Sequence, residues 1–195
     1  MKAFLIIILV LFISCKPQQK NDNIVKDIIE LSQTESKKLK LPESSLKFKS
    51  REQLLETVLS QFNYNTEEKL IVKEVLDDYS VYHCIVYNMS SLMKTNFIFQ
   101  SNLENNEFLL VNKDFSKIDT LANNYTNADE GCENLSEVEL NLLNQSELQY
   151  LNEIINNSST NLYNDPVNNL ILNSKPVNVS LIQNGKLIWV KVFRR

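Results

Sequence analysis

The side chains best suited to nucleophilic and basic chemistry are Cys84 and His83, which are neighbours in the chain. A thiolate paired with a histidine would allow nucleophilic catalysis if the two side chains met. The surrounding residues are rich in Tyr, Val and Ile, which is typical of a β-strand, and consecutive strand residues point to opposite faces. We therefore expect no dyad and interpret His83 as a half-buried histidine whose polar atoms have partners. No catalytic residue is predicted.

Cys84 and Cys132 are the only cysteines beyond the N-terminal segment. An even number of cysteines permits a disulfide in a protein exposed to an oxidising compartment. This bond would close a loop of about 48 residues and stabilise the fold by roughly 4 kcal/mol on the loop-entropy model. The alternative is a buried thiol at Cys84 and a surface thiol at Cys132, and both interpretations stay open at this point.

A group of acidic residues surrounds Gly131 and could offer oxygen ligands to Ca²⁺. When Gly131 is aligned with the glycine of an EF-hand loop, Thr126 and Ala128 occupy positions that require carboxylates, so the motif fails. Acidic residues are also expected near the start of a helix, because they interact favourably with its dipole. We predict no metal site here, although a carboxylate-dependent hydrolase would have its active site in this segment. The acidic residues are Asp129, Glu130, Glu133, Glu137 and Glu139.

The composition argues against two further classes of binding protein. The chain has only two glycines, Gly131 and Gly185, and the loops that bind nucleotide phosphates need clustered glycines. A formal net charge of −4 and a pI near 5.2 are unfavourable for binding nucleic acid. We predict no nucleotide, no nucleic acid and no cofactor.

The periodicity of apolar residues predicts four helices. The first spans 24–40 and has lysines in its last turn, and the second spans 51–62 behind a capping box that begins at Ser50. A third helix is expected after Thr66, because Leu70, Ile71, Val75 and Leu76 recur along the segment. The fourth spans 136–156, opens with a capping box from Ser136 to Glu139, and would be divided in two by a break near Ser146.

Five segments alternate or are rich in β-branched and aromatic residues, which predicts an antiparallel sheet and an α+β fold. The pair Asn184-Gly185 is typical of a two-residue hairpin turn between the last two strands. The last strand is apolar on both faces, so we expect it inside the sheet, with the strand before it covered on one face only. The predicted strands are 79–89, 94–100, 107–112, 177–183 and 186–193.

The N-terminal segment has the features of a signal peptide. Lys2 precedes an 11-residue apolar stretch, Ala3 to Ile13, which would span about 16 Å as a helix, against a hydrocarbon core of ~30 Å. That length suits the apolar region of a signal peptide. The residues that close it, Phe12-Ile13-Ser14-Cys15, resemble the lipobox of bacterial lipoproteins, with Phe12 where the family usually has Leu.

This resemblance covers residues 1–15 and implies that Cys15 becomes an acylated N-terminus. Two or more acyl chains anchor a protein stably to a bilayer. We therefore expect a signal peptide at 1–14, a lipidated tether at 15–23 and one globular domain at 24–195, held at the bacterial envelope, in the outer membrane. The alternatives are ordinary cleaved secretion and a short buried helix of a cytosolic protein.

Asp119-Thr120-Leu121 is similar to the Asp-Ser/Thr-aliphatic acceptor for O-glycosylation in envelope proteins of Bacteroidetes. The resemblance implies a modified Thr120, in a segment predicted to be an exposed loop.

Two functions are compatible with these observations. The first is a non-enzymatic envelope lipoprotein that binds a protein partner as a binding, scaffolding or immunity-type module. The second is a lipid-tethered hydrolase that uses carboxylates. A binder should expose an apolar or aromatic patch, whereas a hydrolase should hold two carboxylates within about 10 Å of each other.

Overall fold

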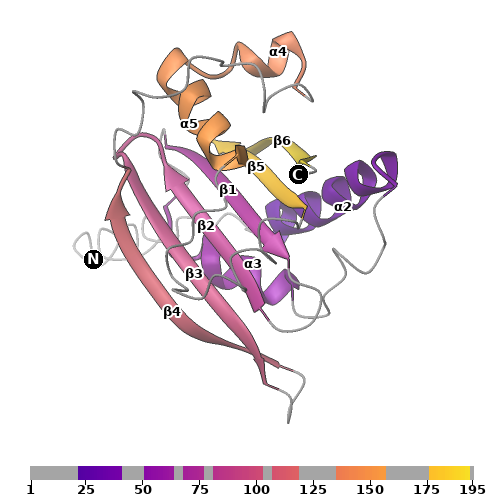
Figure 1. The fold of residues 1–195 in the computed structure, drawn as a ribbon, viewed down its shortest axis with the longest axis vertical. Coiled ribbons are helices and arrows are strands. Elements are labelled where there is room, and N and C mark those ends of the chain that lie inside the picture. The colour runs from indigo at the N-terminus through magenta and orange to yellow at the C-terminus, as the bar shows by residue number, and fades with distance from the viewer. Residues whose placement is uncertain are drawn as a thin grey trace, which may run out of the picture.

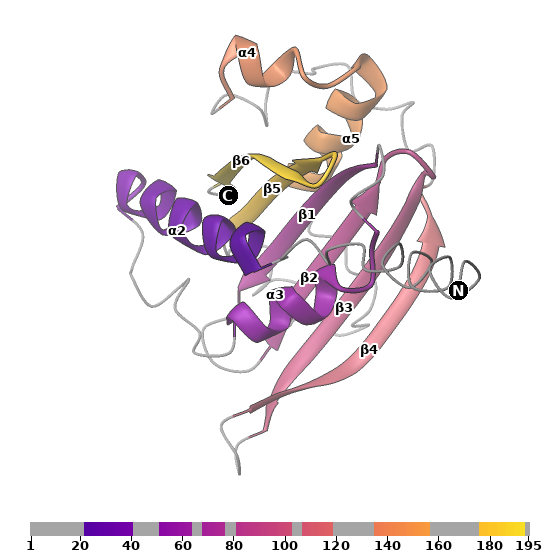
Figure 2. The ribbon, with the colours of Figure 1, turned by 180° about the vertical axis from the view of Figure 1, so that it is seen from behind.

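The computed structural model describes residues 22–40, 51–63, 68–76, 81–102, 107–118, 135–156 and 176–193. Within these ranges the fold is α+β, as predicted, with helices on both faces of one antiparallel sheet (Figures 1 and 2). The sheet has six strands in the order β4-β3-β2-β1-β5-β6, rather than five. Among the described residues, no helix is long and apolar enough to cross a membrane.

The additional strand is β1 (Lys69–Leu76), in the segment for which we predicted a third helix. It lies in the middle of the sheet, between β2 (Val81–Asn88) and β5 (Val177–Gln183), and is antiparallel to both. The helix prediction was wrong because the spacing of the four apolar residues fits either structure. The tertiary environment selects the strand, since alternate residues of β1 are buried on two opposite faces.

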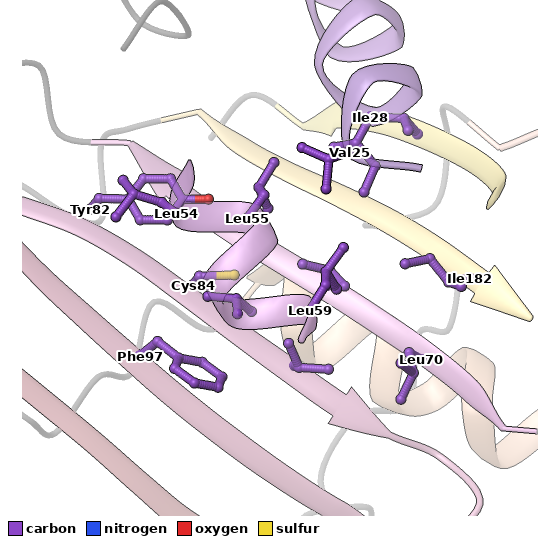
Figure 3. Close-up of a cluster of buried hydrophobic side chains, with 14 of the residues drawn as sticks. Val25, Ile28, Leu54, Leu55, Leu59, Leu70, Tyr82, Cys84, Phe97 and Ile182 are labelled. Carbon is purple, nitrogen blue, oxygen red and sulfur yellow. The ribbon is translucent and has the colours of Figure 1, made fainter. Parts of the chain in front are cut away.

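One face of the sheet is covered by α2 (Asp22–Lys38) and α3 (Arg51–Leu59), and we call it the α2–α3 face. Figure 3 shows the core beneath these helices, where side chains from both helices meet those of the strands. Both helices were predicted, but α3 ends earlier than expected. The core on this face includes Val25, Ile28, Leu55, Leu59, Leu70, Tyr82, Cys84, Phe97 and Ile182.

The opposite face is covered by α5 (Gln145–Asn156) and we call it the α5 face. The short helix α4 (Glu137–Leu140) precedes it, so the predicted helix at 136–156 is indeed divided in two. The capping box from Ser136 to Glu139 is confirmed at the start of α4. The division falls at Asn144, whose side chain accepts a hydrogen bond from the Glu147 amide at 2.9 Å, a cap that we did not predict.

The positions of the last two strands correct two predictions. The strand β6 (Lys186–Phe193) is at the edge of the sheet and not inside it, whereas β5 is inside the sheet and buried on both faces. The alternating polar residues Asn178 and Ser180 suggested a solvent-exposed face, but both lie on the α2–α3 face and are fully buried. The apolar pattern of β6 arises because each of its faces contributes side chains to one of the two cores.

The hairpin between β5 and β6 turns at Asn184 and Gly185, as predicted. Both residues have positive φ, 51° and 69°, which is the geometry of a type I′ turn. The strands β2 and β3 (Met93–Asn102) also match their predictions closely. In contrast, β4 (Glu107–Lys117) is 11 residues long and continues five residues beyond the predicted strand, which ended at 112.

Candidate functional site

Three residues singled out in the sequence lie outside the described residues. These are the predicted lipidation site Cys15, the disulfide candidate Cys132 and the glycosylation candidate Thr120. Each of these sites therefore stays a prediction.

Cys84 is fully buried in the core of the α2–α3 face and forms no disulfide with another described residue. Burial, and next the nearby carboxylate of Glu74, raises the pKa of the Cys84 thiol well above its ordinary value. A thiol held in its protonated form is a poor nucleophile. The environment of Cys84 therefore offers no activation for covalent catalysis.

His83 lies on β2 at the position between Tyr82 and Cys84, and the Cα register places it opposite Val75 of the α5 face. The two side chains of the suspected dyad thus belong to opposite faces. His83 is more buried than we predicted, with 2% of its surface exposed, and its Nε2 atom has no hydrogen-bond partner within the described part of the chain. Burial, and secondarily Lys73, lowers the pKa of His83 to about 3, so the imidazole is neutral at pH 7.

The most concentrated group of polar side chains is a buried polar cluster beneath α2 and α3. Arg51 and Glu74 form its centre, with Arg51 Nε donating to Glu74 Oε1 at 2.9 Å and Nη2 donating to Oε2 at 2.8 Å. Tyr82 donates its hydroxyl to Glu74 Oε1 at 2.7 Å, and the Asn178 amide donates to Oε2. The second terminal nitrogen of Arg51, Nη1, donates to Ser32 Oγ at 2.9 Å.

This cluster joins five elements, four of them directly at the Glu74 carboxylate and α2 through Arg51. Its members come from α2, α3, β1, β2 and β5, and each is at most 1% exposed. A carboxylate offers about four lone-pair sites, and four donors occupy those of Glu74. Burial acts to lower the pKa of Arg51, but the adjacent Glu74 reverses this and raises it, so the guanidinium stays charged. The arrangement is a structural clamp, because Glu74 has no free site for a substrate proton.

The acidic segment proposed for a hydrolase is described only at Glu137 and Glu139. Glu139 Oε2 accepts hydrogen bonds from the Ser136 amide at 2.7 Å and hydroxyl at 2.9 Å, and Oε1 lies 3.3 Å from Lys191 Nζ. Partial burial acts to raise the pKa of Glu139, but the bonds from Ser136 lower it overall. A general acid needs a raised pKa, so Glu139 is suited to capping α4 and not to acid catalysis.

No metal centre was predicted, and in the described ranges no three His, Cys, Asp or Glu side chains lie close enough together to hold a metal ion.

The exposed apolar side chains gather on β4, at one edge of the sheet. In the described part of the chain β4 pairs with β3 alone, and Figures 1 and 2 show it beyond the helices on both faces. Four large apolar residues on this strand are about half exposed or more. They are Leu109 at 53%, Leu110 at 47%, Val111 at 50% and Phe115 at 64%, and we call them the β4 edge.

The β4 edge was missed because its exposure was not predicted for Leu109, Leu110 and Val111, and because Phe115 lies beyond the predicted strand 107–112. The signal in the sequence was the run from Phe108 to Val111, which we used to place a strand but not to judge its exposure. Exposure depends on which strand becomes the edge of the sheet, and no local pattern states that.

Comparison with models of protein families finds no match for this chain, and comparisons with curated proteins and with solved structures find no similar protein.

Proposed function

We propose that the protein is a lipid-anchored, non-enzymatic module of the bacterial envelope that binds another protein through the β4 edge. The proposal combines the predicted acylation of Cys15 with the observation that carries the binding function, the exposed apolar residues of β4.

A long, apolar edge strand is unfavourable in a protein that acts alone. It presents unpaired backbone N–H and C=O groups together with apolar side chains, and so offers a template for another strand. Natural proteins protect such edges with short strands, prolines, charges or covering segments. The 11 residues of β4 contain no proline and only four charged residues, and four large apolar side chains remain exposed. A partner protein would remove this cost by covering them.

The other edge of the sheet supports the same interpretation by contrast. The strand β6 contributes Val190 and Val192 to the core under α2, and Trp189 and Phe193 to the core under α5. Among its large apolar residues only Ile188 counts as exposed, at 38%. The two edges therefore differ, and β4 is the better candidate for an interface.

Site-specific photocrosslinking in the native envelope tests this function. A photoreactive amino acid is placed in the full chain at Leu109 or Phe115 and, as a matched control, at Val138, an exposed apolar residue on α4 (74% exposed). We expect one protein adduct from the two β4 positions and no such adduct from Val138.

A second variant connects the adduct to the edge itself. Replacing Phe115 by Ser in the chain that carries the photoreactive group at Leu109 should abolish the adduct, because it removes the most exposed apolar side chain of the β4 edge. The same adduct from Val138, or an adduct unaffected by Phe115→Ser, would refute binding through β4.

A further inference from the structure

The charges of β4 are separated by sign between the two faces of the sheet. The register with β3 places Lys113 and Lys117 on the α2–α3 face, opposite Phe97 and Met93. Asp114 and Glu107 fall on the α5 face, opposite Asn96 and Asn102. The strand therefore presents lysines on one face and carboxylates on the other.

A β-bulge at Val111 produces this separation. Ile98 pairs with Asn112 and Phe99 pairs with Leu110, so Val111 has no partner in β3 and the alternation of side chains shifts there by one residue. In a regular strand Glu107 would share a face with Lys113, because their positions differ by six, an even number. The bulge moves Glu107 to the face that carries Asp114.

The lysine face is also the more aromatic of the two. Lys113 Nζ lies 5.0 Å from the ring centroid of Phe115 and 5.4 Å from that of Phe97, and it donates to Gln61 Oε1 at 2.8 Å. The ammonium group is thus held beside the most exposed ring of the β4 edge. A carboxylate above an apolar side chain in a partner would meet Lys113 and Phe115 together.

A second copy of this chain that pairs antiparallel is a poor occupant of the edge. Two antiparallel copies of β4 related by a two-fold axis perpendicular to the sheet keep the same faces on the same sides. Lysines would then share one face and carboxylates the other, so no pair of opposite charges could form across the two strands.

A lipid surface is also a poor occupant. The unpaired backbone groups of an edge strand find no hydrogen-bond partner in hydrocarbon, where each costs several kcal/mol, on the order of a lost hydrogen bond or more. Another strand satisfies these groups and covers the apolar side chains at the same time.

From this separation of charge we infer that the β4 edge receives an extended segment of a different protein. The carboxylates of that segment would lie on the same side as the α2–α3 face of the sheet, and its cationic side chains on the same side as the α5 face. Apolar residues at the remaining positions would cover the β4 edge. This inference rests on the proposed function and specifies the chemistry of the partner.

Selection from a displayed library of random ten-residue peptides, with the full acylated chain in detergent micelles as bait, tests the inference. We expect enrichment of peptides in which acidic residues at alternate positions are interleaved with basic ones. A chain with Leu109→Ser and Phe115→Ser should enrich no peptide above background, because the apolar side chains that a peptide would cover are lost.

Two double variants with reversed charges test the two faces of β4 separately. With Lys113→Glu and Lys117→Glu both faces are acidic, so acidic residues should disappear from the selected peptides, and a peptide selected on the parent should bind at least about tenfold more weakly. With Glu107→Lys and Asp114→Lys the basic residues should disappear instead. Lys26→Glu and Lys186→Glu, exposed lysines far from β4 in the sequence, form the control and should leave the selection unchanged.

Several outcomes would overturn the inference. The inference fails if the parent chain enriches no more peptides than the Leu109→Ser/Phe115→Ser chain. It also fails if the two charge variants select peptides with the same charges as the parent chain does. Concentration-dependent dimers in analytical ultracentrifugation that are lost on Phe115→Ser would identify a second copy as the occupant. Binding of a Cys15→Ser chain to phosphatidylglycerol vesicles that depends on Phe115 would identify lipid. If photocrosslinking at Leu109 captures a protein while the selection fails, the proposed function stands and the strand inference falls.

Discussion

At the scale of single residues, the described part of the protein uses its buried ionisable groups for structure. Glu74 and Arg51 neutralise each other with side-on geometry, and Tyr82 donates its hydroxyl to the same carboxylate. Burial, and next the negative charge of Glu74, raises the pKa of Tyr82 well above its ordinary value, so the phenol remains a donor. The full set of hydrogen bonds in this buried polar cluster forms only when all five contributing elements are in place.

Replacing Glu74 by Gln should therefore destabilise the fold strongly. It leaves the buried guanidinium of Arg51 without a countercharge, and breaking a buried ion pair by removing one partner costs about 3–5 kcal/mol. The free energy of unfolding measured by urea denaturation checks this value.

Two further variants complete that experiment. Arg51→Met combined with Glu74→Leu should lose less stability than Glu74→Gln, because no uncompensated charge remains. Glu35→Gln, which breaks the Glu35–Lys38 pair on the surface of α2, should change stability by less than about 1 kcal/mol. Equal losses in Glu74→Gln and Glu35→Gln would contradict the role of the clamp.

His83 makes stability depend on pH. Its pKa is about 3 in the folded protein against an ordinary value of 6.5, so between these values the unfolded chain binds a proton that the folded protein does not. Stability should therefore fall as the pH decreases below about 6.5, by about 1.4 kcal/mol for each pH unit down to about 3. In a His83→Leu variant the dependence should be shallower by that amount. Urea denaturation at pH 7, 6, 5 and 4 measures both, and parallel curves would contradict the prediction.

At the scale of elements, three lysines of the sheet bind the α4–α5 segment. Lys69 Nζ lies 2.6 Å from Glu147 Oε2 and donates to the Leu142 carbonyl at 3.1 Å. Lys191 pairs with Glu139, and Lys73 donates to the Ile154 carbonyl at 2.7 Å. The last contact lies in the final turn of α5, where carbonyl groups lack partners within the helix and cations are favourable.

Lys73→Met should loosen the end of α5. It leaves the Ile154 carbonyl buried without the Lys73 donor, at a cost of about 1–3 kcal/mol. Urea denaturation should show the loss, and amide hydrogen exchange should become faster in the last turn of α5. Lys186→Met, at an exposed position of β6, is the matched control, with an expected change within about 0.5 kcal/mol. Unchanged exchange in α5 would show that Lys73 does not hold this end of the helix.

At the scale of the whole molecule, the sheet is covered on both faces but its two edges are unequal. Figure 1 shows α4 and α5 gathered over β1, β5 and β6, whereas β4 lies at the far side of the sheet. The seven Cα-to-Cα steps from Cys15 to Asp22, where the described chain begins, reach at most about 25 Å when fully extended. A lipid on Cys15 would therefore hold the start of α2 near the bilayer and restrict the search for a partner to envelope proteins.

Replacing Cys15 by Ser tests the anchor. We expect loss of palmitate labelling and release of the protein from the membrane fraction, because serine lacks the thiol through which the lipid would be attached. Metabolic labelling followed by fractionation measures both. A Cys15→Ser protein that still sediments with membranes, or a parent protein that takes up no label, would refute lipid anchoring.

The sequence by itself determined what depends on neighbouring residues. The α+β class, the hairpin at Asn184 and Gly185, the capping box at Ser136 and the opposite faces of His83 and Cys84 all follow from local spacing, because turn geometry, caps and strand alternation are set within a few residues.

The tertiary structure alone decided what depends on contacts between distant segments. Whether Lys69–Leu76 is a helix or a strand, which strand ends the sheet, and the meeting of Arg51, Glu74 and Asn178 were not visible in the local pattern. The physical reason is that burial selects among locally acceptable conformations. Glu74 is tolerated in the core because donors from segments far apart in the chain converge on it, and the β4 edge is exposed because no described strand lies beyond it.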